Sequence, residues 1–325
     1  MLTRRAATGG IAAVAAVALA AVAACSSSSS SSSSSAASSP SASSSSSSSN
    51  PLSQGGASGT VVVGSANFPE NELLAEIYIQ ALQAKGIKVT PKLNIGSREV
   101  YYPQIQKGTI SIIPEYNGTL LTVAVDPTST AKTTTAVDAA LAAKLPSTLE
   151  VLNPASATDS DSVTVTQATA AKDHLKSIAD LKPYAASMVF GGPPEFKTRS
   201  DGLAGLKANY GLTFKGFDPL DESGPITLAA LTDGKVQAAD VFTTTPQIIS
   251  DKLVTLADPK FNFSAQNIIP LVYKPAMNST ITDTLNAISA KLTTAALLQM
   301  DAAVILQHAN YSSTAGAWLK AEGLT

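Results

Sequence analysis

The chain from residue 60 onward switches between two hydrophobic periods. Its first apolar run, TVVVG, is β-branched and continuous, as in a buried strand. The next stretch places leucine, isoleucine and alanine on one face at helical spacing, and Gly86 ends that pattern. The elements predicted in this way are strands at 60–64, 89–93 and 110–113, a helix at 71–84, and a second helix that opens at 96–99 and breaks at Gly108. Strands and helices that alternate in this order predict a parallel sheet covered by helices.

A weaker repeat of the same alternation begins after Asp161. Its predicted strands are 162–166, 188–191, 213–217, 238–242 and 268–273. Its predicted helices are 168–175, 201–210 and 227–232, followed by one or two amphipathic helices over 280–307. Two α/β repeats in one chain predict a clamshell of two lobes, each a mostly parallel sheet flanked by helices. We expect lobe 1 at 60–162 and 271–325 and lobe 2 at 163–270.

Two crossings between the lobes follow from that division, near 159–164 and near 266–271. In open α/β sheets, ligands bind beyond the carboxyl ends of the strands. The segments that follow the predicted strands are therefore candidate pocket walls: 65–68, 96–98, 114–119, 191–196 and 243–246.

The N-terminus has the features of an export signal. Arg4 and Arg5 precede an uninterrupted apolar run from 11 to 24. Fourteen residues are too few for a helix that spans a bilayer but suit the core of a signal peptide. The run ends in Val-Ala-Ala-Cys25, which resembles the bacterial lipobox, whose cysteine is acylated. We expect residues 1–24 to be a lipoprotein signal peptide and Cys25 to be the lipidation site, exported by the general or the twin-arginine route.

The segment from Cys25 to residue 59 consists mostly of serine. It has no apolar surface to offset the entropy of ordering, so we expect a disordered tether. A flexible coil of this length has a mean reach of about 30–35 Å. Such a tether suits a domain held above a membrane surface.

Charge and composition exclude several classes of function. Without residues 1–24 the chain has two basic side chains fewer than its 22, against 24 acidic ones, so its net charge is −4. Nucleic-acid binding needs clustered basic residues, and we expect no such partner. Cys25 is the only cysteine and no Cys/His spacing suggests zinc, so no metal and no cofactor are expected. No GxSxG, HExxH or P-loop motif is present, and we expect a protein that is not an enzyme.

Several blocks resemble the substrate-binding proteins of ABC importers for glycine betaine, choline, carnitine and related osmoprotectants. GSANFPEN at 64–71 is similar to that family's GSKNFTEQ, and GTISIIPEYNGT at 108–119 follows a Gly-Ser-Arg turn as it does there. Pro194-Glu195-Phe196, with Arg199 and the DGL at 201–203, matches a further block. The resemblance covers about residues 60–310 and implies the fold of periplasmic binding proteins.

The departures from that family affect the ligand pocket. Ala66 and Pro69 replace the usual lysine and threonine, and Ser111 replaces the usual aspartate. Near the end of the second lobe, Gln266 and Asn267 stand where the family has a Pro-Pro-Tyr-Asn segment. One aromatic wall is therefore missing, which leaves room for a different polar solute.

The chemistry of a quaternary ammonium group sets the expected walls. Such a group donates no strong N–H hydrogen bond, so binding it takes aromatic faces, each contributing about 0.5–2 kcal/mol. From the motif positions we expect Tyr116, then Tyr101 or its neighbour Tyr102, and also Phe68 and Phe242. Glu115 either contacts the cation or holds its loop.

A betaine also needs donors for its carboxylate. Backbone N–H groups and hydroxyls at helix starts supply them. The expected donors are Ser65, Asn67, Ser97 and Thr119 in lobe 1, and Thr243 and Thr244 in lobe 2. Arg98 and Arg199 either bind the carboxylate directly or pair with acids such as Glu99, Glu195 or Asp201.

Together these features indicate an exported solute-binding lipoprotein. We expect a monomer, anchored at Cys25 to the outer face of the cell membrane, that delivers a small-molecule solute to the membrane subunits of an ABC importer. The leading ligand is glycine betaine or a related quaternary ammonium compound. The alternatives are a binding lipoprotein for another polar solute, such as an amino-acid derivative, and an adhesive lipoprotein without transport.

Overall fold

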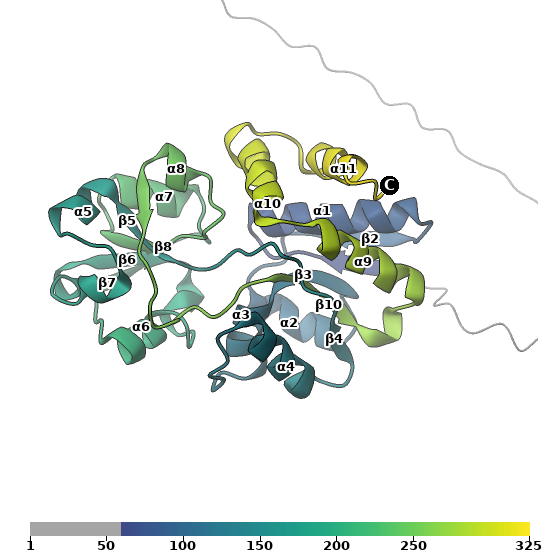
Figure 1. The fold of residues 1–325 in the computed structure, drawn as a ribbon, viewed down its shortest axis with the longest axis horizontal. Coiled ribbons are helices and arrows are strands. Elements are labelled where there is room, and N and C mark those ends of the chain that lie inside the picture. Colours follow the sequence, from purple (N-terminus) through teal and green to yellow (C-terminus); the bar gives the residue numbers. More distant parts are fainter. Residues whose placement is uncertain (1–59) are drawn as a thin grey trace, which may run out of the picture. The chain divides into compact units, whose positions relative to one another are not determined.

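A computed structural model describes residues 60–325 of the chain, all within one compact unit. The predicted signal peptide, Cys25 and the serine-rich tether lie outside the described residues. Two five-stranded sheets organise the described part, each with helices packed against it (Figure 1). We call the sheet that contains the first strand, with its helices, lobe 1, and the other lobe 2.

The lobe 1 sheet has the strand order β2-β1-β3-β10-β4. Its strands are β1 (Val61–Gly64), β2 (Val89–Lys92), β3 (Ile112–Tyr116), β4 (Leu149–Val151) and β10 (Ile268–Tyr273). The pairings β1–β2 and β1–β3 are parallel, whereas β10 is antiparallel to both of its neighbours. The strand that returns from lobe 2 is thus the reversed one, and it lies between β3 and the edge strand β4.

The helices of lobe 1 come from both ends of the described sequence. They are α1 (Pro69–Ala84), α2 (Arg98–Gln106), α3 (Asn117–Thr119), the π-helical turn Leu120–Val125, α4 (Thr134–Lys144), the 3₁₀ turn Lys274–Ala276, α9 (Ser279–Lys291), α10 (Thr294–Asp301), the π-helical turn Ala302–Leu306 and α11 (Tyr311–Ala321). Figure 1 shows α10 and α11, drawn in yellow, beside the purple α1, and α1 packs against both. Within residues 60–325, no single helix has the length and apolar composition to cross a membrane; only α9 and 294–306 taken together, bent by 89°, meet both criteria.

The lobe 2 sheet has the order β7-β6-β8-β5-β9. Its elements are β5 (Val163–Thr166), α5 (Gln167–Lys172), the 3₁₀ turns Ile178–Leu181 and Ala185–Ser187, β6 (Val189–Gly192), the 3₁₀ turn Pro194–Lys197, α6 (Leu203–Tyr210), β7 (Gly216–Pro219), α7 (Pro225–Thr232), β8 (Ala238–Asp240), α8 (Gln247–Ser250) and β9 (Leu253–Thr255). Strand β6 is parallel to β7 and β8, and β5 is antiparallel to β8 and β9. Each sheet therefore has four strands in one direction and one reversed, which confirms the predicted two-lobed α/β fold.

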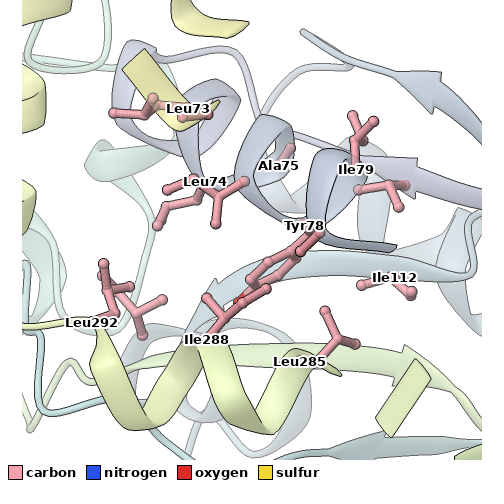
Figure 2. Packing of buried hydrophobic residues seen from close by; sticks show 14 of the residues in the cluster. Leu73, Leu74, Ala75, Tyr78, Ile79, Ile112, Leu285, Ile288 and Leu292 are labelled. Atoms are coloured by element: carbon pink, nitrogen blue, oxygen red, sulfur yellow. The ribbon is translucent and has the colours of Figure 1, made fainter. Parts of the chain in front are cut away.

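Lobe 1 owes its largest core to the apolar face of α1. Leu73, Leu74 and Tyr78 are at most 1% exposed and belong to the same cluster as Ile112 of β3 and Ile288 of α9. Figure 2 shows these side chains together, with Tyr78 reaching from α1 toward Ile288. The C-terminal helices thus complete the core that the N-terminal strand and helix begin.

The structure differs from the predicted elements at several points. Pro114 to Tyr116 lie inside β3, whereas the sequence placed them in the segment after the strand. Pro114 faces Pro270 of β10 across the ladder, so the two missing N–H groups fall opposite each other. The labelled elements that were not predicted are α3, α4, α8, α11, β4 and β9. The two short strands have only three residues each, too few for a periodic signal.

Candidate functional site

A cavity lies between the two lobes. Residues from lobe 1, from lobe 2 and from the two segments that join them line it. They are Ala66, Phe68, Arg98, Tyr101, Tyr116, Thr119, Asp159, Asp161, Arg199, Glu222, Phe242 and Gln266. We call this cavity the main pocket.

A buried ion pair supports the lobe 1 side of the main pocket. Arg98, the first residue of α2, donates from Nε and Nη2 to Glu115 of β3, with Nη2 2.8 Å from Oε2. Arg98 is 7% exposed and Glu115 is fully buried. The Glu115 carboxylate also accepts the Tyr101 hydroxyl at 2.8 Å and the Tyr116 N–H at 3.0 Å. Of the two roles open to Glu115, the structure shows the one that holds the loop and its neighbours.

Aromatic faces from both lobes meet at the main pocket. The ring centroid of Phe68 lies 6.0 Å from that of Tyr116 and 5.0 Å from that of Phe242 in lobe 2. Tyr101 also lines the cavity, whereas Tyr102 does not, because adjacent residues of a helix point in different directions. All four predicted aromatic positions are thus brought together, with Tyr101 the member of its pair that faces the pocket.

The Tyr116 hydroxyl ties the main pocket to a second carboxyl group. It donates to Glu70 Oε1 at 2.6 Å, and Glu70, at the start of α1, also accepts from the Thr244 hydroxyl of lobe 2 at 2.6 Å. Burial, followed by the nearby charge of Asp301, raises the pKa of Glu70 well above its usual value. Burial and the negative charge of Glu70 likewise raise the pKa of Tyr116, so this phenol stays protonated.

Arg199 forms the main ionic contact between the lobes. Its Nε and Nη2 donate to the two carboxylate oxygens of Glu99 in α2, both at 3.0 Å. Glu195 lies 3.7 Å from the same guanidinium. Burial opposes the charge of Glu99, but the hydrogen bond and the charge of Arg199 outweigh it and hold the pKa of Glu99 down at about 2. Besides this ion pair and the bond from Thr244 to Glu70, a polar contact between the lobes runs from the Thr122 hydroxyl to Asp201 at 2.9 Å.

The polar residues expected to serve as donors in lobe 1 are mostly engaged within the protein. Ser65 is buried and donates to the Ala66 carbonyl, and Asn67 is exposed. Ser97 precedes α2 without lining the main pocket. Thr119 does line it, but its N–H donates to the side chain of Gln266 at 3.0 Å. Gln266 therefore fixes Thr119 from the opposite crossing segment.

The expected donors of lobe 2 bond to buried carboxylates. The Thr243 hydroxyl and the Thr244 N–H both donate to Asp159 Oδ1 at 3.0 Å. Neither threonine lines the main pocket. The structure thus leaves the two arginines as the cationic donors among the residues that line this cavity.

Three acids that line the main pocket were missed by the sequence analysis: Asp159, Asp161 and Glu222. Two of them lie on the predicted crossing between the lobes, which necessarily faces the cleft. Glu222 follows β7, so the rule for strand ends would have found it had that strand been placed correctly. Burial raises the pKa of Asp161 to about 6 and that of Glu222 to about 8. Burial therefore shifts both carboxyl groups toward their neutral, protonated form.

Fold and site together define a two-lobed solute-binding protein. The pocket lies between two α/β lobes joined by two crossings, and it combines aromatic faces, carboxyl groups and two guanidinium groups. Nothing in the described part of the chain groups three or more His, Cys, Asp or Glu side chains as a metal ion would need.

Comparison with known proteins places the chain more narrowly. The family described as the substrate-binding domain of the ABC-type glycine betaine transport system matches residues 59–321, and the chain belongs to that family. The glycine betaine-binding protein YehZ of Escherichia coli is 28% identical over 283 residues, covering 83% of this chain and 92% of YehZ.

Solved structures agree with this fold. Apo YehZ from Escherichia coli is 26% identical, covers 82% of this chain and 99% of its own, and has a TM-score of 0.57. A glycine betaine/carnitine/choline ABC transporter structure has a TM-score of 0.63 at 20% identity, covering 81% of this chain and 99% of its own. Membership in this family implies a binding role.

Proposed function

We propose that this protein binds glycine betaine, or a related quaternary ammonium solute, and delivers it outside the cytoplasm to the membrane subunits of an ABC importer. The observation that carries the proposal is the main pocket, where four aromatic side chains from both lobes converge beside buried carboxyl groups. Family membership supports the transport role, and the name of the relative YehZ supports the ligand.

The orientation of the ligand follows from the two kinds of side chain that line the main pocket, aromatic rings and guanidinium groups. The trimethylammonium group contacts Tyr116, Phe68 and Phe242, whose ring faces attract a cation that cannot donate N–H bonds. The ligand carboxylate turns toward Arg98 and Arg199. Each of these guanidinium groups uses Nε and Nη2 for its ion pair, which leaves Nη1 for the ligand. Because Phe68 belongs to lobe 1 and Phe242 to lobe 2, a ligand beside this pair of rings contacts both lobes at once.

Calorimetric titration of the purified protein tests this function. Glycine betaine should bind saturably with one site per chain. Its carbon isostere, with a quaternary carbon in place of the nitrogen, should bind at least tenfold more weakly because it keeps the shape and the carboxylate but lacks the cation. Choline keeps the cation and lacks the carboxylate, so its loss of affinity reports on the arginines. Equal affinity for glycine betaine and the isostere would show that the positive charge of the ligand does not contribute to binding, and would favour another polar solute as the natural ligand.

We further propose that the protein is a monomer anchored to the outer face of the cell membrane through an acylated Cys25. The support is the sequence around Cys25, which lies outside the described residues. Cys25→Ala should abolish acylation and release the protein from the membrane fraction, as followed by fractionation and mass spectrometry. Substitution of a tether serine by alanine is the matched control and should leave the anchor in place. If Cys25→Ala instead stayed in the membrane fraction with its signal peptide uncleaved, the lipobox assignment would be contradicted.

A further inference from the structure

A second cavity of about 410 Å³ adjoins the main pocket. The two cavities share Phe68, Glu222 and Phe242 as lining residues, so they meet at the aromatic contact between the lobes. The second cavity extends away from the arginines toward the start of α1 and the end of α10. Three acids line it: Glu70, Glu222 and Asp301. We call these three residues and the cavity they line the acidic subsite.

Buried acceptor atoms without donors distinguish the acidic subsite. Asp301 is 1% exposed, and neither of its carboxylate oxygens has a hydrogen-bond donor among the described residues. Its neighbour is the Glu70 carboxyl, which is itself an acceptor unless one of the pair carries a proton. Glu222 Oε2 and Gln247 Oε1 are also buried without a donor in the described part of the chain, and the Glu222 carboxyl faces that of Glu195, with which it can share a proton. Buried acceptors of this kind are costly, so several of them around one cavity call for a donor from outside the protein.

The charge around the acidic subsite excludes an anion. No lysine, arginine or histidine is among the residues that line the cavity. Helix α7 begins at its wall, but the N–H groups of Ile226 and Thr227 already donate to the Asp221 carboxylate. Arg98 and Arg199 lie on the side of the main pocket and do not line the subsite; their charge offsets only part of the rise in the pKa of Glu222 that burial causes.

The chemistry of the walls narrows the occupant to one class. A quaternary ammonium group has no N–H to give these acceptors. A metal ion needs closely spaced ligands, and the described residues hold no such group of acids. Leu228, Ile305 and Pro69 add apolar surface beside the acids, which suits a short alkyl chain. A protonated alkylamine supplies both the N–H donors for the acids and the alkyl chain for the apolar surface.

We propose that the acidic subsite binds the protonated primary or secondary amine of an alkylammonium ligand, with N–H donors directed at Asp301 and Glu222. This amine belongs either to a separate small cation or to the far end of a solute whose other end occupies the main pocket. The site goes beyond the proposed function, and it stands even if the main pocket proves to bind something other than glycine betaine. Burial raises the pKa of Asp301 and of Glu222 to about 8, so an ammonium that ionises these groups should release protons near neutral pH.

Calorimetry of the full-length protein with propylamine tests the subsite. Propylamine should bind saturably, with proton release seen as a difference in heat between two buffers of unequal ionisation enthalpy. Asp301→Asn keeps the shape and removes the charge, and should weaken propylamine at least tenfold. Asp283→Asn, on the exposed face of α9, is the matched control and should change nothing. Glu222→Gln provides a second variant, from lobe 2, in case Asp301→Asn does not fold.

Three further ligands separate the sources of the cation. Tetramethylammonium and potassium chloride should not compete with propylamine; competition by potassium alone would overturn the proposal in favour of an inorganic ion.

If the amine is part of the transported solute, a trimethylammonium compound with a primary amine at its other end should displace both glycine betaine and propylamine. If it is a separate cation, glycine betaine and propylamine should bind together. Absence of saturable propylamine binding, or equal binding by wild type and Asp301→Asn, would show that Glu70 and Asp301 only share a proton. Glycine betaine titrated in the same experiments reports on the main pocket, so its failure is distinguishable from failure of the subsite.

Discussion

Replacing Arg98 with methionine should lower the free energy of unfolding by about 3–5 kcal/mol. Among residues 60–325, Arg98 is the only charge partner of Glu115, which is fully buried. Once the guanidinium is removed, the carboxylate keeps the hydroxyl of Tyr101 and the N–H of Tyr116 but loses its counter-charge. A buried charge without a partner costs far more than the pair gains. Urea denaturation followed by circular dichroism measures the loss.

Two comparisons make this prediction specific. Lys291→Met breaks the surface pair with Glu322, whose side chains are 53% and 33% exposed, and should cost at most about 1 kcal/mol. Combining Arg98→Met with Glu115→Gln should recover part of the loss, because no buried charge then remains unpaired. If Arg98→Met were as mild as Lys291→Met, Arg98 would not hold this site together.

Tyr116→Ala should weaken glycine betaine binding by about 1–2 kcal/mol, or about five- to thirtyfold in the dissociation constant. The substitution removes one aromatic face of the main pocket and the ring that packs against Phe68. Tyr116→Phe should cost much less, since the ring face attracts the cation. The hydroxyl instead donates to Glu70, on the side of the acidic subsite. Calorimetric titration of the three proteins gives the comparison.

The control for this series is Tyr184→Ala, which removes a partly buried tyrosine of lobe 2 away from the main pocket. It should leave affinity unchanged within twofold. Equal losses for Tyr116→Ala and Tyr116→Phe would indicate that the hydroxyl hydrogen-bonds a polar solute. If neither variant lost affinity while the fold stayed intact, Tyr116 would be a packing residue only.

The sequence predicted the two-lobed α/β architecture because local hydrophobic patterns indicate the order of its strands and helices. The β-branched run of β1 and the apolar face of α1 identify a buried strand followed by an amphipathic helix, and their repetition after residue 161 predicts a second sheet. The resemblance to the family's motifs, and not periodicity, indicated the four aromatic residues as pocket walls; periodicity placed their segments beside strand ends and helix starts. Periodicity failed at β4 and β9, where three residues are too few to show a period.

The polar site was decided by tertiary structure alone. Glu115 is separated from Arg98 by 17 residues, and Glu70 from Thr244 by 174, so no local pattern indicates that these groups meet. Asp301 reaches the start of α1 only because the C-terminal helices return to lobe 1. Hydrophobic spacing records which face of an element is buried, whereas the partner of a buried charge depends on how distant elements pack. For this reason the sequence by itself determined the two lobes and the aromatic walls, and only the folded chain decided which of the described acids are paired and which have buried oxygens without a donor.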